Sequence, residues 1–310
     1  DLTSLLQLVK FIRNEKPAIV HTHTPKAGTL GMLAAWLCRV PVRLHTVAGL
    51  PLMETTRAKR KILNFVEKIT YACATKVYPN SFALRDFILE SNFCKPEKLH
   101  VVGNGSSNGI NTLFFFREAV VHEKIDKIKN EYEILPGDFV FIFIGRLVKD
   151  KGINELITAF DNLYQKNKNI KLLLVGKQEP KLDPLKKETL KKIQTNSAIV
   201  PTGYQMDVRP FLAASHVLVF PSYREGFPNV PMQAGAMGLP SIVTDINGCN
   251  EIIQHGHNGL VISPKNTVEL ENAMLRLLLE PELTQQLASN ARQSIVSRFN
   301  QQTLWELIKE

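Results

Sequence analysis

The sequence lacks the features that mark membrane-spanning, secreted and metal-stabilised proteins. No apolar run approaches the roughly 18 residues of a membrane-spanning helix. The chain opens directly into helical periodicity, without the basic and apolar regions of a secretory signal. Its four cysteines are scattered and form no Cys-x-x-Cys pair, so we expect neither a zinc site nor a disulfide framework. These absences favour a globular protein of the reducing cytoplasm.

The excess of positive charge is confined to the first part of the chain. Residues 1–115 hold 15 Lys and Arg against 7 Asp and Glu, whereas residues 116–310 hold 23 against 22. Four basic residues concentrate this charge: Arg57, Lys59, Arg60 and Lys61. The cluster suits a solvated helix face, or an anionic partner such as a membrane surface. We expect no nucleic acid, because no recognition motif accompanies the charge.

Strands and helices alternate along the first part of the chain. The pattern predicts helices over Leu5–Arg13, Ala27–Cys38, Arg57–Ala72 and Phe82–Glu90. It predicts strands over Ala18–His21, Val42–Val47, Lys76–Tyr78 and Lys98–Val102. Strands that alternate with helices in this way predict an α/β domain whose parallel sheet is covered on both faces.

A second α/β pattern follows a turn-rich break at Gly103–Gly109 and a charged stretch, residues 117–134, with little apolar period. Five apolar strands are predicted at Phe139–Ile144, Leu172–Val175, Ala198–Val200, Val217–Phe220 and Ser241–Val243. Helices are predicted at 152–166, 183–194, 207–214, 229–237 and 266–297, and from Gln301. We therefore divide the chain into domains at 1–115 and 116–300, with residues 301–310 starting a further helix.

The loop after Ile144 carries groups suited to a phosphorylated ligand. Ligands of parallel α/β sheets bind beyond the carboxyl ends of the strands, where loops and helix amino termini converge. Gly145 permits close approach of the backbone, while Arg146 and Lys151 supply positive charge for a diphosphate. By itself this loop suits a solvated connection with incidental basic residues equally well.

The loop after Phe220 leads into a helix that we expect to start near Pro228. That start directs the backbone N–H groups of residues 226–229 toward the ligand side. Glu225 lies just before the helix, where its carboxylate can stabilise the helix dipole or accept hydrogen bonds from sugar hydroxyls. Gln233 shares a helix face with Asn229, and its amide suits a ribose diol.

Further segments complete a pattern that extends over nearly the whole chain. They are Val20–Gly28, Gly103–Ile110, Gly145–Leu147, Lys151–Gly152, Leu172–Gly176, Thr202–Tyr204, Pro221–Asn229 and Ala234–Pro240. With these segments the sequence resembles the retaining glycosyltransferases of family 4, particularly the bacterial capsule, O-antigen and exopolysaccharide enzymes. The resemblance implies the GT-B fold, with two facing Rossmann-like, doubly wound α/β domains, of which the N-terminal one is incomplete at its start.

The resemblance also implies a reaction and its residues. It implies transfer of a sugar from a nucleotide sugar, expected to be a UDP-sugar, to a lipid-linked glycan at the inner face of the plasma membrane, with the basic N-terminal half facing that membrane. Arg146 and Lys151 would stabilise the leaving diphosphate without a metal or other cofactor, and Glu225, the first glutamate of the family's Glu-x7-Glu pattern, would contact the donor sugar. The remaining donor-site residues implied are Gly145, Gly203, Tyr204, Gly226, Phe227, Pro228, Asn229 and Gln233. The acceptor-side residues implied are Thr24, Lys26, Ala48 and Gly49.

The sequence departs from the family pattern at three places. Gln233 replaces the second glutamate of the pattern, and we expect the lost charge to weaken donor binding by about 1 kcal/mol. Ala48 stands where many relatives have a histidine, and His45 lies three residues earlier on the predicted strand. The first strand and the glycine-rich loop of relatives would lie before the start of this chain.

These departures leave a second hypothesis open beside an active transferase. The chain can instead be a catalytically impaired relative that binds nucleotide sugars or serves as a scaffold. A nucleotide-sugar epimerase of the same architecture is a third class, which the loop at Glu225–Asn229 disfavours because it does not resemble theirs.

Overall fold

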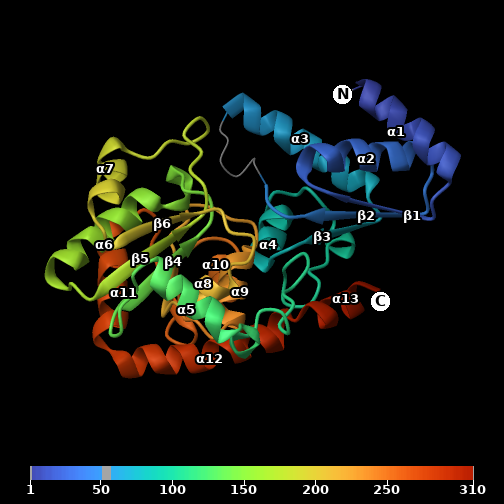
Figure 1. Ribbon diagram of the computed structural model, residues 1–310. Coiled ribbons are helices and arrows are strands. Elements are labelled where there is room, and N and C mark those ends of the chain that lie inside the picture. Colours follow the sequence, from blue (N-terminus) through green and yellow to red (C-terminus); the bar gives the residue numbers. More distant parts are fainter. Residues whose placement is uncertain (1, 51–56, 310) are drawn as a thin grey trace. The chain divides into compact units, whose positions relative to one another are not determined.

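The computed structural model describes residues 2–50 and 57–309 (Figure 1). The chain forms two compact units, one of residues 1–108 and 304–310 and the other of residues 109–303. Each unit is built on its own parallel sheet. Within the described residues, no helix is long and apolar enough to cross a membrane.

The first unit is built on a three-stranded parallel sheet in the order β1-β2-β3. Its strands are β1 (Ile19–His23), β2 (Val42–Val47) and β3 (Lys76–Pro79). Its helices are α1 (Leu2–Glu15), α2 (Pro25–Leu37), α3 (Arg57–Cys73) and α4 (Phe82–Glu90), with α13 (Gln301–Lys309) joining it from Leu304. Helix α2 packs against α1, α3 and the first two strands. Helix α4 begins where Ser81 accepts a hydrogen bond from the Leu84 N–H at 3.1 Å, a cap that stabilises a helix by about 1 kcal/mol.

The predicted fourth strand of this sheet, Lys98–Val102, does not form. A 3-10 turn, η2 (Pro96–Lys98), leads into the segment, and only Leu99 forms a bridge with Val77 of β3. The Lys98 ammonium donates instead to backbone carbonyl oxygens at the end of α3, at 2.8 to 3.4 Å. The Val102 carbonyl then accepts a hydrogen bond from Gly105, which turns the chain away. The apolar residues therefore run beside β3 for too short a distance to make a ladder.

The second unit contains a six-stranded parallel sheet in the order β6-β5-β4-β7-β8-β9. Its strands are β4 (Phe139–Ile144), β5 (Ile170–Val175), β6 (Ile199–Gly203), β7 (Val217–Phe220), β8 (Ser241–Thr244) and β9 (Gly259–Ile262). Its longer helices are α5 (His122–Glu131), α6 (Ile153–Lys166), α7 (Lys187–Thr195), α9 (Asn229–Ala236), α11 (Thr267–Leu279) and α12 (Pro281–Phe299). The shorter ones are η3 (Arg117–Ala119), η4 (Lys149–Lys151), α8 (Arg209–Ala213) and α10 (Cys249–Ile252).

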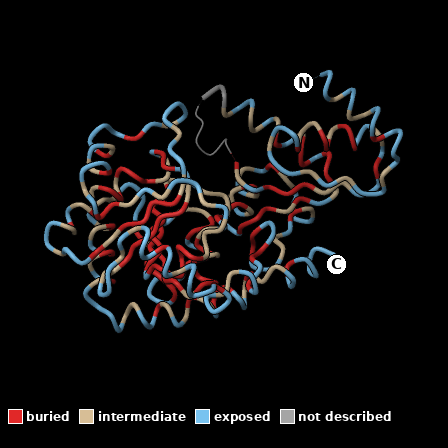
Figure 2. The backbone as a smooth tube through the Cα atoms, in the orientation of Figure 1, coloured by how far each residue is buried: buried red, intermediate tan, exposed pale blue. Residues whose placement is uncertain are grey.

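The core of the second unit follows from its apolar strands. Strand β4 reads Phe-Val-Phe-Ile-Phe-Ile, and every residue after Phe139 is buried. A strand that is apolar on both faces is typical of a parallel sheet covered by helices on both sides. Figure 2 shows the buried backbone concentrated in these strands.

Helix α5, strand β9 and helix α10 of this unit are not predicted by the sequence. Residues 117–134 are charged and show little apolar period, so no helix is predicted there, yet they include α5, which packs against α8 and buries only Ile128. One buried position gives too little apolar period to reveal a helix. Helix α10 spans four residues, about one turn, which is too short to show a helical period, and strand β9 also spans four residues.

Candidate functional site

The strand order of the second unit reverses between β4 and β7. From β4 the next strands, β5 and β6, extend the sheet to one side, whereas β7, β8 and β9 extend it to the other. All six strands run parallel, so the loops after β4 and β7 leave the same edge of the sheet side by side. A crevice beyond such a reversal is the usual ligand site of an open α/β sheet.

Lys151 and Glu225 meet at this reversal. Lys151 ends the loop after β4, and Glu225 lies in the loop after β7. The Lys151 Nζ donates to Glu225 Oε1 at 2.5 Å, and the two side chains are only 16% and 15% exposed. Because both charges are partly removed from water, the attraction between them is stronger. Each charge is poorly solvated and is stabilised mainly by its partner. The structure thus brings two of the three predicted catalytic residues into one ion pair.

Arg146, the third predicted catalytic residue, lies in the same loop as Lys151 and pairs with Glu179 of the loop after β5. The Arg146 Nη1 donates to Glu179 Oε2 at 2.9 Å. This hydrogen bond raises the pKa of Arg146, and the charges of Asp150 and Glu225 add to the effect. The guanidinium is therefore held in its charged form, in part by the nearby Glu225 carboxylate.

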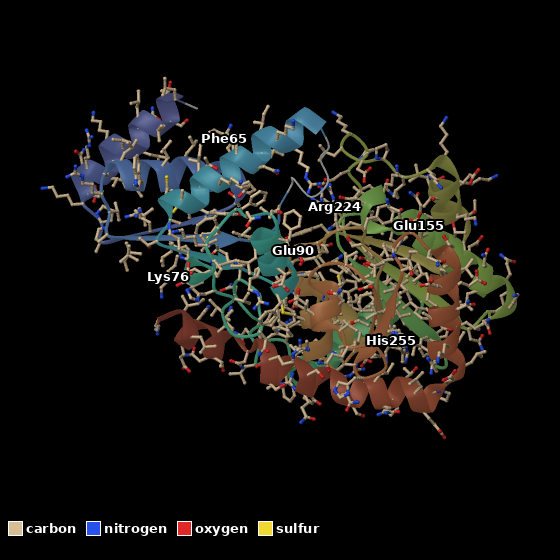
Figure 3. All side chains as sticks on the ribbon, turned by 180° about the vertical axis from the view of Figure 1, so that it is seen from behind. Phe65, Lys76, Glu90, Glu155, Arg224 and His255 are labelled. Carbon is tan, nitrogen blue, oxygen red and sulfur yellow. The ribbon has the colours of Figure 1, made fainter. Side chains whose placement is uncertain are left out.

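Two further side-chain contacts fasten the loop after β7 to the segment after β4. The Tyr223 hydroxyl donates to Glu155 Oε2 at 2.6 Å, and Arg224 donates to Asp150 Oδ2 at 3.1 Å through Nη2. Figure 3 labels Glu155 and Arg224. Burial raises the pKa of Tyr223, and the hydrogen bond to Glu155 raises it further. Tyr223 therefore remains protonated and acts as a hydrogen-bond donor.

Glycine lets the backbones of these loops touch. Gly152 has φ 70° and precedes α6, and a Cβ there would overlap the Pro221 carbonyl of the loop after β7. A Cβ on Gly176 would likewise overlap the Gly145 carbonyl. These two close approaches bring the loops after β4, β5 and β7 together at one sheet edge.

The loop after β8 supports the backbone next to Glu225. The Asn247 Nδ2 donates to the Gly226 carbonyl at 2.6 Å and to the Glu225 carbonyl at 3.3 Å. A Cβ on Gly248 would overlap the Gly226 carbonyl, so the two loops are in contact. The peptide groups that follow Glu225 are therefore held in place from the side of β8.

Helix α9 begins as the sequence predicts. Pro228 is the residue before the helix and Asn229 is its first residue, which leaves Pro231 within the first turn. Phe227 packs edge-on against Phe299 with ring centroids 5.5 Å apart. Gln233 lies partly exposed one turn into the helix.

Gly203 is the last residue of β6, and Tyr204 is the first residue of the loop that follows it. Gly203 has φ 71°, and the Tyr204 side chain is 65% exposed. The Lys177 ammonium lies 5.3 Å from the centre of the Tyr204 ring. An exposed aromatic face of this kind can stack on a planar ligand.

The predicted acceptor-side residues gather at one edge of the sheet in the first unit. Thr24 and Lys26 lie at the start of α2, directly after β1, and Ala48 and Gly49 follow β2. Strands β1 and β2 are parallel neighbours, so both segments leave the same edge. Ala48, Thr24 and Lys26 are exposed there.

His45 does not take the place of the histidine that relatives have at the position of Ala48. Its side chain is only 2% exposed, and its Nδ1 pairs with the Thr22 hydroxyl at 2.8 Å. Burial lowers the pKa of His45 to about 4, and the charges of His23 and His21 add to the effect. His45 is therefore a neutral core residue.

Several residues that shape this site are not predicted from the sequence. They are Glu155, Glu179 and Asn247, which contact Tyr223, Arg146 and Gly226 respectively. Glu179 and Asn247 each follow a parallel strand, and that position is the signal that can find such residues. Among the residues that the structure describes, no group of three or more His, Cys, Asp and Glu side chains is placed to hold a metal ion.

Comparison with protein families gives matches to both parts of the chain. Residues 124–294 match a model described as glycosyl transferases group 1, and residues 1–105 match one described as a glycosyl transferase 4-like domain. Capsular polysaccharide biosynthesis glycosyltransferase CapM of Staphylococcus aureus is 34% identical over 306 residues, which cover 99% of this chain and 79% of CapM. UDP-Gal:alpha-D-GlcNAc-diphosphoundecaprenol alpha-1,3-galactosyltransferase of Escherichia coli is 29% identical over 307 residues, covering 97% of this chain and 76% of that enzyme.

Solved structures of other proteins share the architecture of this chain. The crystal structure of Anabaena Alr3699/HepE in complex with UDP matches 98% of this chain and 80% of that protein, with a TM-score of 0.84 and 21% sequence identity. At this level of identity the likeness shows the fold. It confirms the GT-B fold class that the sequence predicts.

Proposed function

We propose a donor, an acceptor and a stereochemical course for this chain, which belongs to the group 1 glycosyl transferases and is a glycosyltransferase. It transfers a sugar from a UDP-sugar to a lipid-linked glycan, with retention of configuration, in the synthesis of a surface polysaccharide. Two proteins similar to this chain support this choice. The E. coli relative uses UDP-Gal and a diphosphoundecaprenol-linked acceptor, and the Anabaena protein binds UDP.

The contact between Lys151 and Glu225 carries the proposal for the donor. It joins a cation suited to a diphosphate to a carboxylate suited to sugar hydroxyls, at the reversal of strand order. The two halves of a nucleotide sugar differ in this way, with an anionic diphosphate next to a neutral polyol. Arg146 adds a second positive charge in the same loop. We propose that Arg146 and Lys151 bind the diphosphate and that Glu225 accepts hydrogen bonds from the sugar.

The same residues support the proposed reaction. The acceptor hydroxyl attacks the anomeric carbon from the face that the diphosphate leaves. The bond between the anomeric carbon and the diphosphate oxygen breaks, and an oxygen of the departing diphosphate takes the proton of the hydroxyl. Charge builds up on the leaving diphosphate, where Arg146 and Lys151 stabilise it without requiring a metal ion. Preorganised charges of this kind typically contribute 100- to 1,000-fold each, about 3–4 kcal/mol. Gly203 and Tyr204 border the nucleobase, and Gly145, Gly226, Phe227, Pro228, Asn229 and Gln233 complete the donor site.

We also propose that the first unit binds the acceptor at a membrane surface on the cytoplasmic side, through Thr24, Lys26, Ala48, Gly49 and helix α3. On α3, Ile62 and Phe65 are 64% and 65% exposed, and exposed Lys61 and Lys68 lie on the same side of the helix. Figure 3 labels Phe65 on this helix. An exposed apolar stripe flanked by lysines is typical of helices that lie in a lipid interface. Of the predicted basic cluster, Arg57 and Lys59 have side chains outside the described residues.

A transfer assay tests the reaction. Purified protein is mixed with radiolabelled UDP-sugars and polyprenyl diphosphate-linked glycans, and the label in the lipid fraction is measured. We expect transfer from a UDP-sugar, and a loss of about 100-fold or more in Arg146→Ala. No transfer from any UDP-sugar, in a protein that binds UDP, would support the impaired relative instead.

Sedimentation with lipid vesicles tests the membrane surface separately. Binding to anionic vesicles should exceed binding to neutral ones and should weaken as salt rises. Phe65→Ser should reduce it several-fold, whereas Phe11→Ser, at a 61% exposed position on α1, should not. Equal sedimentation with neutral and anionic vesicles contradicts this role of α3.

A further inference from the structure

Glu179 belongs to no motif that the proposed function uses, yet it forms the ion pair with Arg146. The two groups come from neighbouring strands, because Arg146 follows β4 and Glu179 follows β5. Their atoms are 2.9 Å apart, the Arg146 side chain is 49% exposed and the Glu179 side chain is 33% exposed. The pair is therefore half in water, unlike the more buried pair of Lys151 and Glu225.

The position of Glu179 is set by contacts on both sides of it, one between two backbones and one between a side chain and a backbone. On one side, the Leu147 N–H donates to the Lys177 carbonyl at 2.8 Å, and Leu147 forms a bridge with Gln178. On the other side, Asp183 Oδ2 accepts a hydrogen bond from the Asp150 N–H at 2.6 Å. The loop after β5 is thus fastened twice to the loop after β4. Glu179 lies between the two attachments, within reach of Arg146.

We infer that Glu179 is a counter-ion of Arg146 that the donor diphosphate must displace, so that it lowers the affinity of the site for the donor. This inference rests on the proposed function, in which Arg146 binds the diphosphate. A guanidinium presents its donors in a planar fork, and a diphosphate offers more charge and more acceptor oxygens than one carboxylate. An ion pair as exposed as this one is weak, so a diphosphate can replace it.

Displacement of Glu179 by a diphosphate makes the donor site select ligands with a diphosphate over neutral nucleosides. A ligand with a diphosphate can compete with Glu179 for Arg146, whereas a neutral nucleoside cannot. Glu179 also carries a negative charge that repels any anion approaching Arg146. The carboxylate is therefore expected to lower the affinity for UDP but not the affinity for uridine.

Calorimetric titration with UDP, and with uridine as the ligand without phosphate, tests the inference in four proteins: the unchanged chain, Glu179→Gln, Arg146→Ala and the double variant. Glu179→Gln should bind UDP about two- to fivefold more tightly, the range that an exposed ion pair allows. Arg146→Ala should bind UDP at least tenfold more weakly, and the double variant should bind it no better than Arg146→Ala does. Glu188→Gln, which neutralises an exposed carboxylate on α7, is the charge-matched control and should leave the affinity unchanged.

Each outcome bears on a different claim. Unchanged or weaker UDP binding by Glu179→Gln, while Arg146→Ala binds weakly, overturns the inference and leaves the proposed donor site standing. Equal tightening in the Arg146→Ala background also overturns it, because the effect would then be general repulsion. Arg146→Ala binding UDP as tightly as the unchanged chain overturns the role of Arg146 and the inference together. Tighter binding of uridine by Glu179→Gln contradicts the dependence on phosphate.

Discussion

The Lys151 ammonium lies 2.5 Å from the Glu225 carboxylate, although 74 residues separate them in the chain. The pair spans the reversal of strand order between β4 and β7. Because both side chains are mostly buried, removing one partner leaves the other as a poorly solvated charge. The contact therefore couples the stability of the two loops to the chemistry that we propose for them.

Variants of Lys151 and Glu225 should show separate effects on the stability of the protein and on its transferase activity. We expect Lys151→Met and Glu225→Gln each to lower the free energy of unfolding by roughly 1–3 kcal/mol, and the double variant by clearly less than the sum. Transfer should fall about 100-fold in all three, since each lacks a group of the donor site. Urea unfolding and initial rates measure the two effects. Additive losses of stability would show that the side chains do not interact in solution.

Two glycines with the same backbone conformation should respond differently to alanine. Gly152 has φ 70° and Gly203 has φ 71°, but a Cβ on Gly152 overlaps the Pro221 carbonyl, whereas one on Gly203 has no heavy atom within 4 Å. Gly203→Ala should cost only the left-handed conformation, about 1–2 kcal/mol. Gly152→Ala should cost more, because the loops after β4 and β7 must move apart. Thermal unfolding compares the two directly, and equal losses would contradict the close approach.

Restoring the glutamate of the family pattern should strengthen donor binding. A carboxylate accepts a hydrogen bond from a hydroxyl more strongly than an amide does, by about 1 kcal/mol, so Gln233→Glu should bind UDP up to about fivefold more tightly. Gln233→Ala should bind it more weakly. Calorimetry with UDP gives both values. If Gln233→Glu binds no better than the unchanged chain, Gln233 does not contact the ribose.

The buried His45 should make the first unit less stable in acid. Its pKa is about 4 in the folded chain and 6.5 when exposed, so below pH 6.5 the unfolded chain binds more protons. The stability that neutral His45 provides is complete above pH 6.5 and is lost as the pH falls toward 4, about 3 kcal/mol in total. Urea unfolding at pH 7 and pH 5 should show this loss reduced in His45→Asn but not in His100→Asn, a change at an exposed position. The same pH dependence in the unchanged chain, His45→Asn and His100→Asn would contradict this role of His45.

Much of the local structure can be predicted from the sequence because its determinants are close together in the chain. Helix α4 and strand β2 have the predicted bounds, and α9 starts after Pro228 as its turn chemistry requires. The predictions fail where local signals are weak or are overridden by other contacts. Helix α5 buries only Ile128, and Lys98 caps α3 instead of continuing into a strand.

The sequence by itself determined the family, the alternation of strands and helices, and the two loops that supply Arg146, Lys151 and Glu225. These features depend on residue type and on spacings of a few residues. Only the tertiary structure decided which of these groups meet. Lys151 reaches Glu225 across 74 residues, and Arg146 reaches Glu179 across 33, because β7 and β5 lie on opposite sides of β4. Strand order depends on how the whole sheet packs, which no local pattern encodes.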